Sequence, residues 1–161
     1  LEGFELKKVM GNQTTEAVIK LASKELFVKK KVNHIETVVG AIIEREKLGG
    51  LGIPGTTMAL FHARSPHVMT QTFTIYVLEK PVEVIGMDQK EMEISSLVLM
   101  LSPEETSEQA LEVLSYLSTL LIESEESISV FQSDDQEMIK TYLTARLDQF
   151  FTEKLMEIRG V

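Results

Sequence analysis

The sequence predicts an α/β (α+β) domain in which a central mixed β-sheet of about four to five strands is flanked by helices on both sides. Segments with apolar residues at helical spacing occupy both ends of the chain, and strand-like segments lie between them. With 161 residues, 43% of them hydrophobic, the chain can bury the core that such a layered domain requires. We expect one domain over residues 13–161, preceded by a weakly patterned linker remnant at residues 1–12.

Two helices are expected ahead of the strands. From Thr15, apolar residues recur at helical spacing until about residue 30. Asn33, followed three residues later by Glu36, has the pattern of a capping box, and we expect a second helix from there to Lys47. The next segment, LGGLGIPG, holds four glycines and a proline, which favour neither helix nor strand. We interpret it as a linker between the second helix and the sheet.

Four segments in the middle of the chain have the composition of strands. Residues 58–62, MALFH, form a short one, and residues 72–79, TFTIYVLE, alternate in the manner of a longer one. A third candidate, VEVIG at residues 82–86, is bounded by a proline and by its own final glycine. Residues 97–101, LVLML, are apolar without interruption, which is typical of a strand covered on both faces.

Two further helices are expected after the strands. The first begins in the segment SPEETSEQ, with Ser102 as N-cap and Pro103 in the first turn, where these residue types are preferred. The second is amphipathic and extends from about Asp135 to Ile158. Its apolar positions, which we expect to face the core, are Ile139, Leu143, Leu147, Phe150 and Leu155.

The charge of the chain narrows the choice of partners. Twenty-five acidic residues against 16 basic ones give a net charge of −9, so we expect no direct contact with nucleic acid. An acidic surface instead favours a basic protein partner through electrostatic steering. The chain has no cysteine, and no apolar run approaches the roughly 18 residues of a membrane span. We expect a cytoplasmic protein without membrane insertion.

The strand MALFH ends in a histidine, at a position where α/β domains usually place their chemistry. Imidazole can act as a base, a ligand or a phosphoryl acceptor. If the strand persists to Arg64, its two-residue period places that guanidinium on the same face as His62. A neighbouring cation holds an imidazole neutral, and a guanidinium binds phosphate oxygens. The pair suits phosphoryl transfer, although a partly buried histidine beside a solvated arginine gives the same pattern.

Other kinds of site find little support. His67 follows Pro66 and is expected on a turn, and no HxxxH or HExxH spacing supports a metal site. No GxSxG motif indicates a hydrolase, and the glycine-rich segment lacks the Lys-Ser/Thr pair of a phosphate-binding loop. We therefore expect neither a metal nor a nucleotide cofactor.

Residues 42–63 carry a family resemblance. The segments IEREKLGGLGIPG and MALFHA resemble the enzyme IIA domain of the mannitol/fructose class of the bacterial sugar phosphotransferase system. The resemblance implies that a histidine takes a phosphoryl group from the carrier protein HPr and passes it to a IIB partner, without a metal or a nucleotide. That histidine corresponds to His62, and the arginine of the family's Glu-Arg-Glu-Lys element corresponds to Arg45.

The chain departs from the family pattern at three positions. Phe61 replaces the family proline before the histidine, and Ala63 replaces the glycine after it. Ala110 stands where the family often has a second histidine that helps to hold the phosphate. An Ile-Pro pair does occur in GIPG, but Gly55 occupies its histidine position. We therefore match the family strand to MALFH, and the acceptor to His62.

The form ALFHARSPH is most similar to the IIA-like domain at the C-terminus of mannitol operon transcriptional activators. This resemblance implies a phosphorylation sensor that adjoins other regulatory domains of the same chain. In that interpretation His62 is the phosphoryl acceptor, and Arg45 and Arg64 bind the phosphate oxygens. Three further residues are candidates for auxiliary roles: His67, Glu44 and Glu46. Two alternatives stay open, namely a stand-alone IIA transport component and a docking module that is not phosphorylated.

Overall fold

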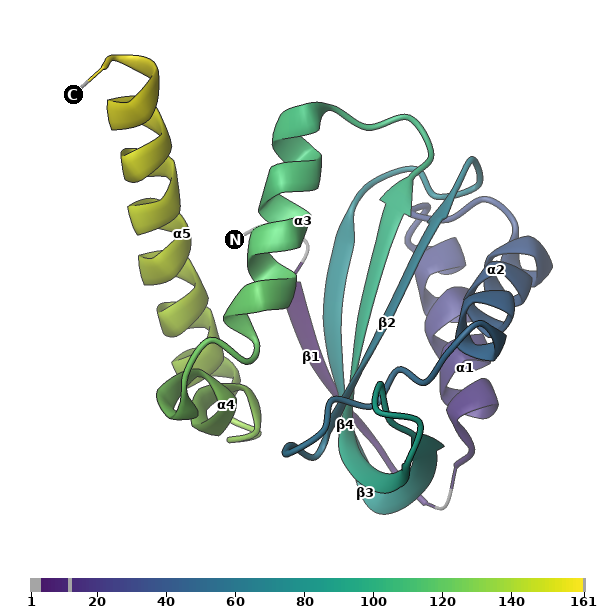
Figure 1. Cartoon of the computed structure of the whole chain (residues 1–161). Helices are drawn as coiled ribbons and strands as arrows, with labels where there is room; N and C mark the ends of the chain where they lie inside the picture. The colour runs from purple at the N-terminus through teal and green to yellow at the C-terminus, as the bar shows by residue number, and fades with distance from the viewer. Residues whose placement is uncertain (1–3, 12, 161) are drawn as a thin grey trace.

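The computed structural model describes residues 4–11 and 13–160. In this part of the chain, four strands and five helices follow one another in the order β1-α1-α2-β2-β3-β4-α3-α4-α5 (Figure 1). The strands are β1 (Phe4–Val9), β2 (Met58–Ser65), β3 (Thr72–Ile85) and β4 (Glu91–Pro103). The helices are α1 (Thr15–Val28), α2 (Ile35–Lys47), α3 (Glu108–Leu120), α4 (Glu125–Phe131) and α5 (Gln136–Ile158). Among the described residues, none of the helices combines the length and the apolar composition that crossing a membrane requires.

The strands form one mixed sheet in the order β1-β3-β4-β2. β1 lies parallel to β3, β2 lies parallel to β4, and the central pair β3–β4 is antiparallel. α1 and α2 cover one face of the sheet, and α3, α4 and α5 lie on the other (Figure 1). The expectation of a mixed sheet with helices on both sides is therefore confirmed.

The first strand was not expected, because we interpreted residues 1–12 as a linker remnant. β1 instead forms one edge of the sheet, beside β3. Phe4 and Val9 at its two ends are buried in the cores on opposite faces, and the residues between them are mostly polar. An edge strand tolerates such a composition, so the segment carries no clear strand pattern. Residues 1–3 and 12 lie outside the described part of the chain.

Two of the expected strands form a single one. β3 extends through both 72–79 and 82–86 as far as Ile85, and its pairing with β4 shifts register between Val77 and Val82. Pro81 lies inside this irregularity, where the strand needs no backbone donor from it. A proline therefore interrupts the pattern of β3 without ending the strand.

Two helices begin at caps other than the expected ones. α2 is capped by His34 rather than Asn33, and the Nδ1 of His34 accepts a backbone N–H of the first turn at 3.2 Å. α3 is capped by Ser107, five residues after the expected cap. Ser102 and Pro103 still belong to β4, because the buried strand continues past its apolar run.

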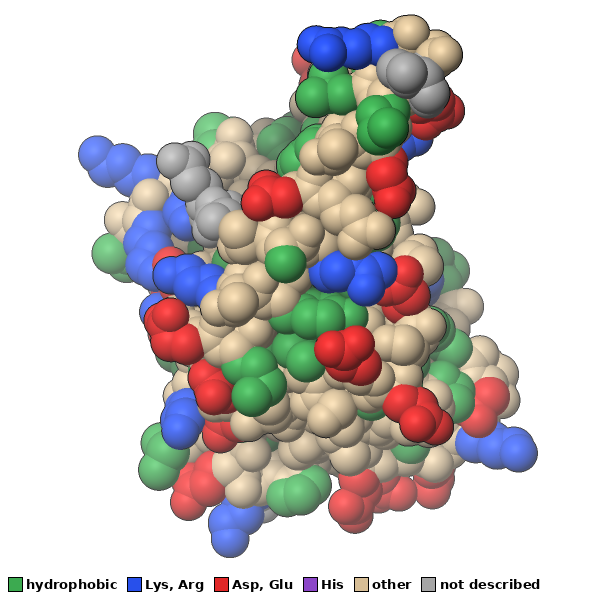
Figure 2. Space-filling model, turned by 90° about the vertical axis from the view of Figure 1, so that its left-hand side faces the viewer, with side chains coloured by type: hydrophobic (Ala, Val, Ile, Leu, Met, Phe, Trp, Pro, Cys, Tyr) green, Lys and Arg blue, Asp and Glu red, His purple; other side chains and the backbone are tan. Residues whose placement is uncertain are grey.

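The bounds of the last helix agree with the prediction, but the burial of its far end and the presence of a further short helix do not. α5 begins after its N-cap Asp135 and ends at Ile158, as predicted, and its first inward positions are buried. The prediction for Leu155 was wrong, because this residue is half exposed where the end of α5 projects beyond the rest of the molecule (Figures 1 and 2). α4 was not expected, since seven residues are too few to display a helical repeat.

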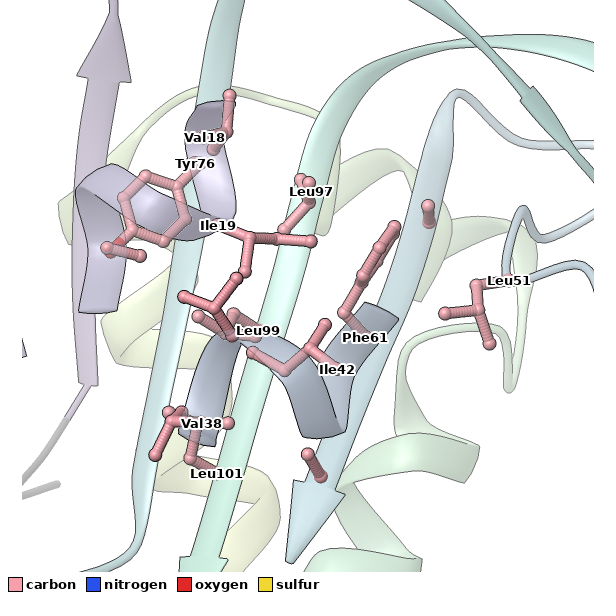
Figure 3. Packing of buried hydrophobic residues seen from close by; sticks show 14 of the residues in the cluster. Val18, Ile19, Val38, Ile42, Leu51, Phe61, Tyr76, Leu97, Leu99 and Leu101 are labelled. Carbon is pink, nitrogen blue, oxygen red and sulfur yellow. The ribbon is translucent and has the colours of Figure 1, made fainter. Parts of the chain in front are cut away.

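A separate apolar core lies on each face of the sheet. On the side of α1 and α2, Phe61 of β2 belongs to the same cluster as Ile42 of α2 and Leu99 of β4 (Figure 3). On the other side, Met100 of β4 belongs to the cluster that α3 and α5 complete. Successive residues of β4 serve opposite cores, because side chains alternate along a strand. LVLML is therefore confirmed as a strand buried on both faces.

The glycine-rich segment between α2 and β2 is held against the tip of the β3–β4 hairpin. Gly52 donates its backbone N–H to the carbonyl of Ile85 at 3.1 Å, and its own carbonyl accepts the N–H of Met87 at 2.7 Å. A Cβ atom at Gly50 would lie 2.0 Å from the carbonyl oxygen of Gly86, so only glycine fits there. The expected linker is thus an ordered strap whose composition follows from close backbone approach.

Candidate functional site

β2 places His62 at an edge of the sheet. Side chains alternate along the strand, so His62 shares a face with Leu60 and Arg64, on the side of α3. Phe61 faces the opposite core and therefore does not enclose the imidazole (Figure 3). Because β2 is an edge strand, the His62 side chain is only partly buried.

Arg64 lies on the same face as His62 because β2 continues to Ser65. Its guanidinium is exposed, and Nη2 donates a hydrogen bond to the backbone carbonyl of Glu104 at 2.8 Å. This bond ties the end of β2 to the loop that precedes α3. A guanidinium has five N–H donors, so the same group retains the capacity to bind an anion.

Arg45 reaches the same place from the last turn of α2. A hollow of about 360 Å³ lies between this helix and the end of β2. Its lining residues are Ala41, Glu44, Arg45, Leu48, His62, Ala63 and Arg64. The predicted acceptor, both predicted arginines and one auxiliary candidate therefore meet around one cavity.

The surroundings of His62 favour the uncharged form of its imidazole. Burial lowers the pKa of His62 below its ordinary value of 6.5, and the positive charges of Arg64 and Arg45 lower it further. A neutral imidazole carries an unprotonated ring nitrogen. That nitrogen can act as a base or as a nucleophile at neutral pH.

One ring nitrogen of His62 is not held by a hydrogen bond. Nε2 is buried and has no partner among the described residues. Glu44 lines the hollow, but its carboxylate pairs with Lys47 at 3.2 Å. The orientation of the ring therefore depends on packing and on whatever binds in the hollow.

Two auxiliary candidates lie away from His62. Glu46 lines a different hollow, with side chains of the β3–β4 hairpin, and burial raises the pKa of its carboxyl. His67 forms a hydrogen bond between Nδ1 and Oδ1 of Asn33 at 2.8 Å, and its ring lies 5.4 Å from that of His34. Within residues 4–11 and 13–160, no three His, Asp or Glu side chains gather in a group that could hold a metal ion.

A second hollow beside His62 has no signal in the sequence. It measures about 480 Å³, lies between β2 and α3, and is mostly apolar with a few hydroxyl groups. Its lining residues are Ile53, Leu60, His62, Met87, Leu111, Leu114, Ser115, Ser118, Thr119 and Ile122. Ile53 and Met87 reach it through the contact between the glycine-rich strap and the hairpin tip. His62 therefore stands between a basic hollow and an apolar one.

Polar residues that no motif indicated lie at the same end of the sheet. Ser102 pairs with Arg64 across β4 and β2, and its fully buried hydroxyl has no partner among the described residues. Gln71 donates its side-chain amide to the backbone carbonyl of Ala110 at 3.4 Å, in the first turn of α3. Ala110 itself offers no polar side chain to this site.

Comparison with known families gives a match over most of the chain. The family model described as phosphoenolpyruvate-dependent sugar phosphotransferase system, EIIA 2, matches residues 6–145. A relative from Streptococcus mutans, named as a transcriptional regulator, MtlR, is 27% identical over 108 residues. The match covers 67% of this chain and 16% of the relative, so the matched part spans about a sixth of that regulator's length.

Solved structures share the fold. Nitrogen regulatory protein IIA-Ntr from Neisseria meningitidis has a TM-score of 0.63 at 24% identity, covering 80% of this chain and 84% of its own. The Escherichia coli complex of mannitol enzyme IIA with phosphorylated enzyme IIB has a TM-score of 0.59 at 17% identity. That match covers 86% of this chain and 94% of the other. The layered arrangement of sheet and helices is therefore the fold of IIA domains.

Proposed function

Because the chain belongs to the EIIA 2 family of the phosphoenolpyruvate-dependent sugar phosphotransferase system, we propose that it is a phosphoryl-accepting IIA domain with His62 as the acceptor. The observation that carries the proposal is one hollow in which a histidine of lowered pKa meets two guanidinium groups. An imidazole that stays neutral is a nucleophile, and two cations suit the charge of a phosphoryl group. The proposed donor is HPr.

In the proposed reaction, a ring nitrogen of neutral His62 attacks the phosphorus of phospho-HPr in line. The new N–P bond forms while the bond between phosphorus and the donor's histidine breaks, and the electron pair of that bond returns to the donor imidazole. The transition state is loose, with its charge on the three equatorial oxygens. We propose that Arg45 and Arg64, which both line the hollow, bind these oxygens.

We propose a IIB domain as the partner that exchanges phosphoryl groups with His62. The Escherichia coli mannitol IIA protein has been solved in complex with phosphorylated IIB. In this chain the apolar hollow beside His62 offers a surface on which a partner can exclude water from the transfer. The net charge of −9 favours the approach of basic partners, and we propose HPr as one of them.

A regulatory setting is supported by the relative from Streptococcus mutans, which is named as a transcriptional regulator. We propose that residues 13–161 act as the sensor domain of a mannitol-type regulator and report phosphorylation to neighbouring domains. A phosphoryl group adds about −1.5 to −2 charges at neutral pH. It competes with the carbonyl of Glu104 for Arg64, and so changes how the loop before α3 is held.

A docking module that is not phosphorylated is the second candidate. It is favoured by Ala110, which brings no side chain to hold a phosphate, and by the buried, unpartnered Nε2 of His62. In that role the domain keeps the fold and binds a IIB domain or a neighbouring regulatory domain. A stand-alone IIA transport component differs from both in its gene context, since a permease gene lies beside the gene of such a component.

The experiment that separates these functions is phosphoryl uptake. The 161-residue chain is incubated with phosphoenolpyruvate, enzyme I and HPr, and its intact mass is measured. The proposal predicts a gain of about 80 Da that is lost in acid and requires HPr. Arg45→Gln and Arg64→Gln are expected to slow the gain, whereas Lys24→Gln, on the exposed side of α1, is the control. An unchanged mass with active HPr excludes the acceptor function and leaves the docking module, which is then tested by binding to a IIB domain.

A further inference from the structure

One apolar row of α5 passes from the core into solvent. Ile139, Leu143, Leu147, Phe151 and Leu155 follow one another at four-residue spacing. Four residues advance the row by about 40° around a helix of 3.6 residues per turn. The first three are therefore buried, whereas Phe151 is 49% and Leu155 53% exposed. Ile158 extends the exposed part and is 80% exposed. We name Phe151, Leu155 and Ile158 the terminal stripe.

The terminal stripe lies beside the residues that hold this end of α5. Phe150 stacks on Tyr116 of α3 with ring centroids 4.5 Å apart, and Lys154 pairs with Glu112 at 3.3 Å. Phe150 and Lys154 lie on the face of α5 that contacts α3, and these two contacts fix the orientation of the helix. The stripe is centred about 87° farther around the helix, and Phe151 adjoins the contact face, since its ring centroid lies 5.6 Å from that of Phe150. The end of α5 that carries it projects beyond the rest of the molecule (Figure 2).

The terminal stripe also lies beyond the part of the chain that the family shares. The family model ends at residue 145, thirteen residues before the end of α5 at Ile158. The stripe therefore lies outside the region that the family model describes. Exposed large apolar side chains that gather on one face indicate a contact surface.

Two opposite charges flank the terminal stripe on one side. Asp148 and Arg159 are eleven residues apart, which is close to three helical turns, so they lie on the same side of α5 about 16 Å from each other. Neither forms a salt bridge within residues 4–11 and 13–160. The stripe thus has an acid beside its beginning and a base beside its end.

We propose that the terminal stripe binds the terminal stripe of a second copy of this chain, with the two helices antiparallel about a two-fold axis. Antiparallel pairing brings Asp148 beside Arg159 of the partner subunit, twice. It also lets Phe151 interleave with Leu155 of the partner subunit, since the two residues lie on opposite sides of the axis. In a parallel pair each charge would lie at the level of its own copy, about 16 Å along the axis from the opposite charge, and neither ion pair would form. The surface is therefore complementary to itself only in the antiparallel arrangement.

The proposal is tested by sedimentation equilibrium of the 161-residue chain over a range of concentrations. It predicts a reversible monomer–dimer equilibrium that Leu155→Glu weakens at least about tenfold, since a carboxylate is then buried in the contact. Val28→Glu replaces an apolar residue at the end of α1 that is 79% exposed, and is expected to leave the equilibrium unchanged. A chain that stays monomeric at every concentration, or a dimer that Leu155→Glu does not weaken, overturns the proposal.

A charge exchange tests the antiparallel arrangement. Asp148→Arg alone places two arginines together and is expected to weaken the dimer. Adding Arg159→Asp in the same chain restores opposite charges and is expected to recover the original affinity. Both positions are exposed, so the monomer should unfold as the unchanged chain does, which circular dichroism checks. Failure of the second change to restore the dimer overturns the proposed orientation.

Discussion

His62 and Arg64 leave the same face of β2 two residues apart, and the guanidinium of Arg64 lowers the pKa of the His62 imidazole. Arg64 is held at 2.8 Å by the backbone carbonyl of Glu104, on the loop that leads into α3. One side chain therefore affects both the protonation of the imidazole and the position of a surface loop. In the proposed function this is the link between phosphorylation of His62 and a change that a neighbouring domain can detect.

The first prediction concerns the titration of His62. Its pKa, measured by NMR of the imidazole protons, is expected below the ordinary 6.5 because of burial and the two arginines. Arg64→Gln and Arg45→Gln should each raise it, and Arg64→Gln more, since Arg64 has the larger effect of the two. Lys24→Gln, on the exposed side of α1, is the control that should leave the pKa of His62 unchanged. A pKa of His62 that neither replacement raises would show that the arginines do not face the ring.

The second prediction concerns stability at acid pH. Below about pH 6.5, His62 becomes protonated in the unfolded chain, whereas in the folded chain its lowered pKa keeps it neutral to a lower pH. The unfolded state therefore binds more protons in this window. The free energy of unfolding therefore falls as pH falls through this window, and His62 has no such effect above it. His62→Gln removes this loss. The free energy of unfolding in urea is measured for both chains at pH 7.5 and 5.5. The variant should be more stable relative to the unchanged chain at pH 5.5 than at pH 7.5. The same difference in free energy at both pH values would refute the linkage.

The third prediction concerns the glycine strap. A Cβ at Gly50 would lie 2.0 Å from the carbonyl oxygen of Gly86, so Gly50→Ala must push the strap from the hairpin tip. We expect a loss of at least about 2 kcal/mol in the free energy of unfolding. Gly40→Ala is the matched control, because nothing lies within 4 Å of a Cβ there and α2 should gain about 0.5–1 kcal/mol. Equal effects of the two replacements would mean that the strap does not contact the hairpin.

The fourth prediction concerns the inner face of α5. Leu143 is fully buried in the core on the α3 side, and Leu143→Ala is expected to cost about 2–5 kcal/mol. Met138, on the same helix, is half exposed, so Met138→Ala should cost about 0.5 kcal/mol or less. Chemical unfolding of the two variants measures the difference. Similar losses of unfolding free energy in the two variants would show that Leu143 does not face the core, and so that α5 does not pack as described.

Much of the fold could be predicted because it follows from periodicity. The uninterrupted apolar run LVLML predicts a central strand, because both faces of such a strand are buried. The start of α5 could be predicted as well, because Asp135 is an acid that caps its first turn. β1 was missed because an edge strand needs few apolar residues. The start of α3 was misplaced because Ser102 is a buried strand residue, although serine is usually a cap or a surface residue.

The site could be predicted where it depends on one strand and one helix end. Arg64 follows from the two-residue period of β2, and Arg45, in the last turn of α2, was assigned from the resemblance to the family's Glu-Arg-Glu-Lys element. Glu46 is next to Arg45 in sequence, but one residue turns a helix by about 100° and directs it to another hollow. His67 contacts Asn33, and no local pattern encodes such a tertiary contact. The apolar hollow beside α3 depends on four separate segments and has no signature of its own.

The most direct test of the account is phosphoryl uptake by three variants that each lack one histidine: His62→Gln, His67→Gln and His34→Asn. Asparagine can still cap α2 at position 34, so that helix should persist. With phosphoenolpyruvate, enzyme I and HPr, the account predicts that the unchanged chain, His67→Gln and His34→Asn all gain about 80 Da, and that His62→Gln gains nothing. A gain in His62→Gln, or no gain in any of the four chains, would contradict the assignment of His62 as the phosphoryl acceptor.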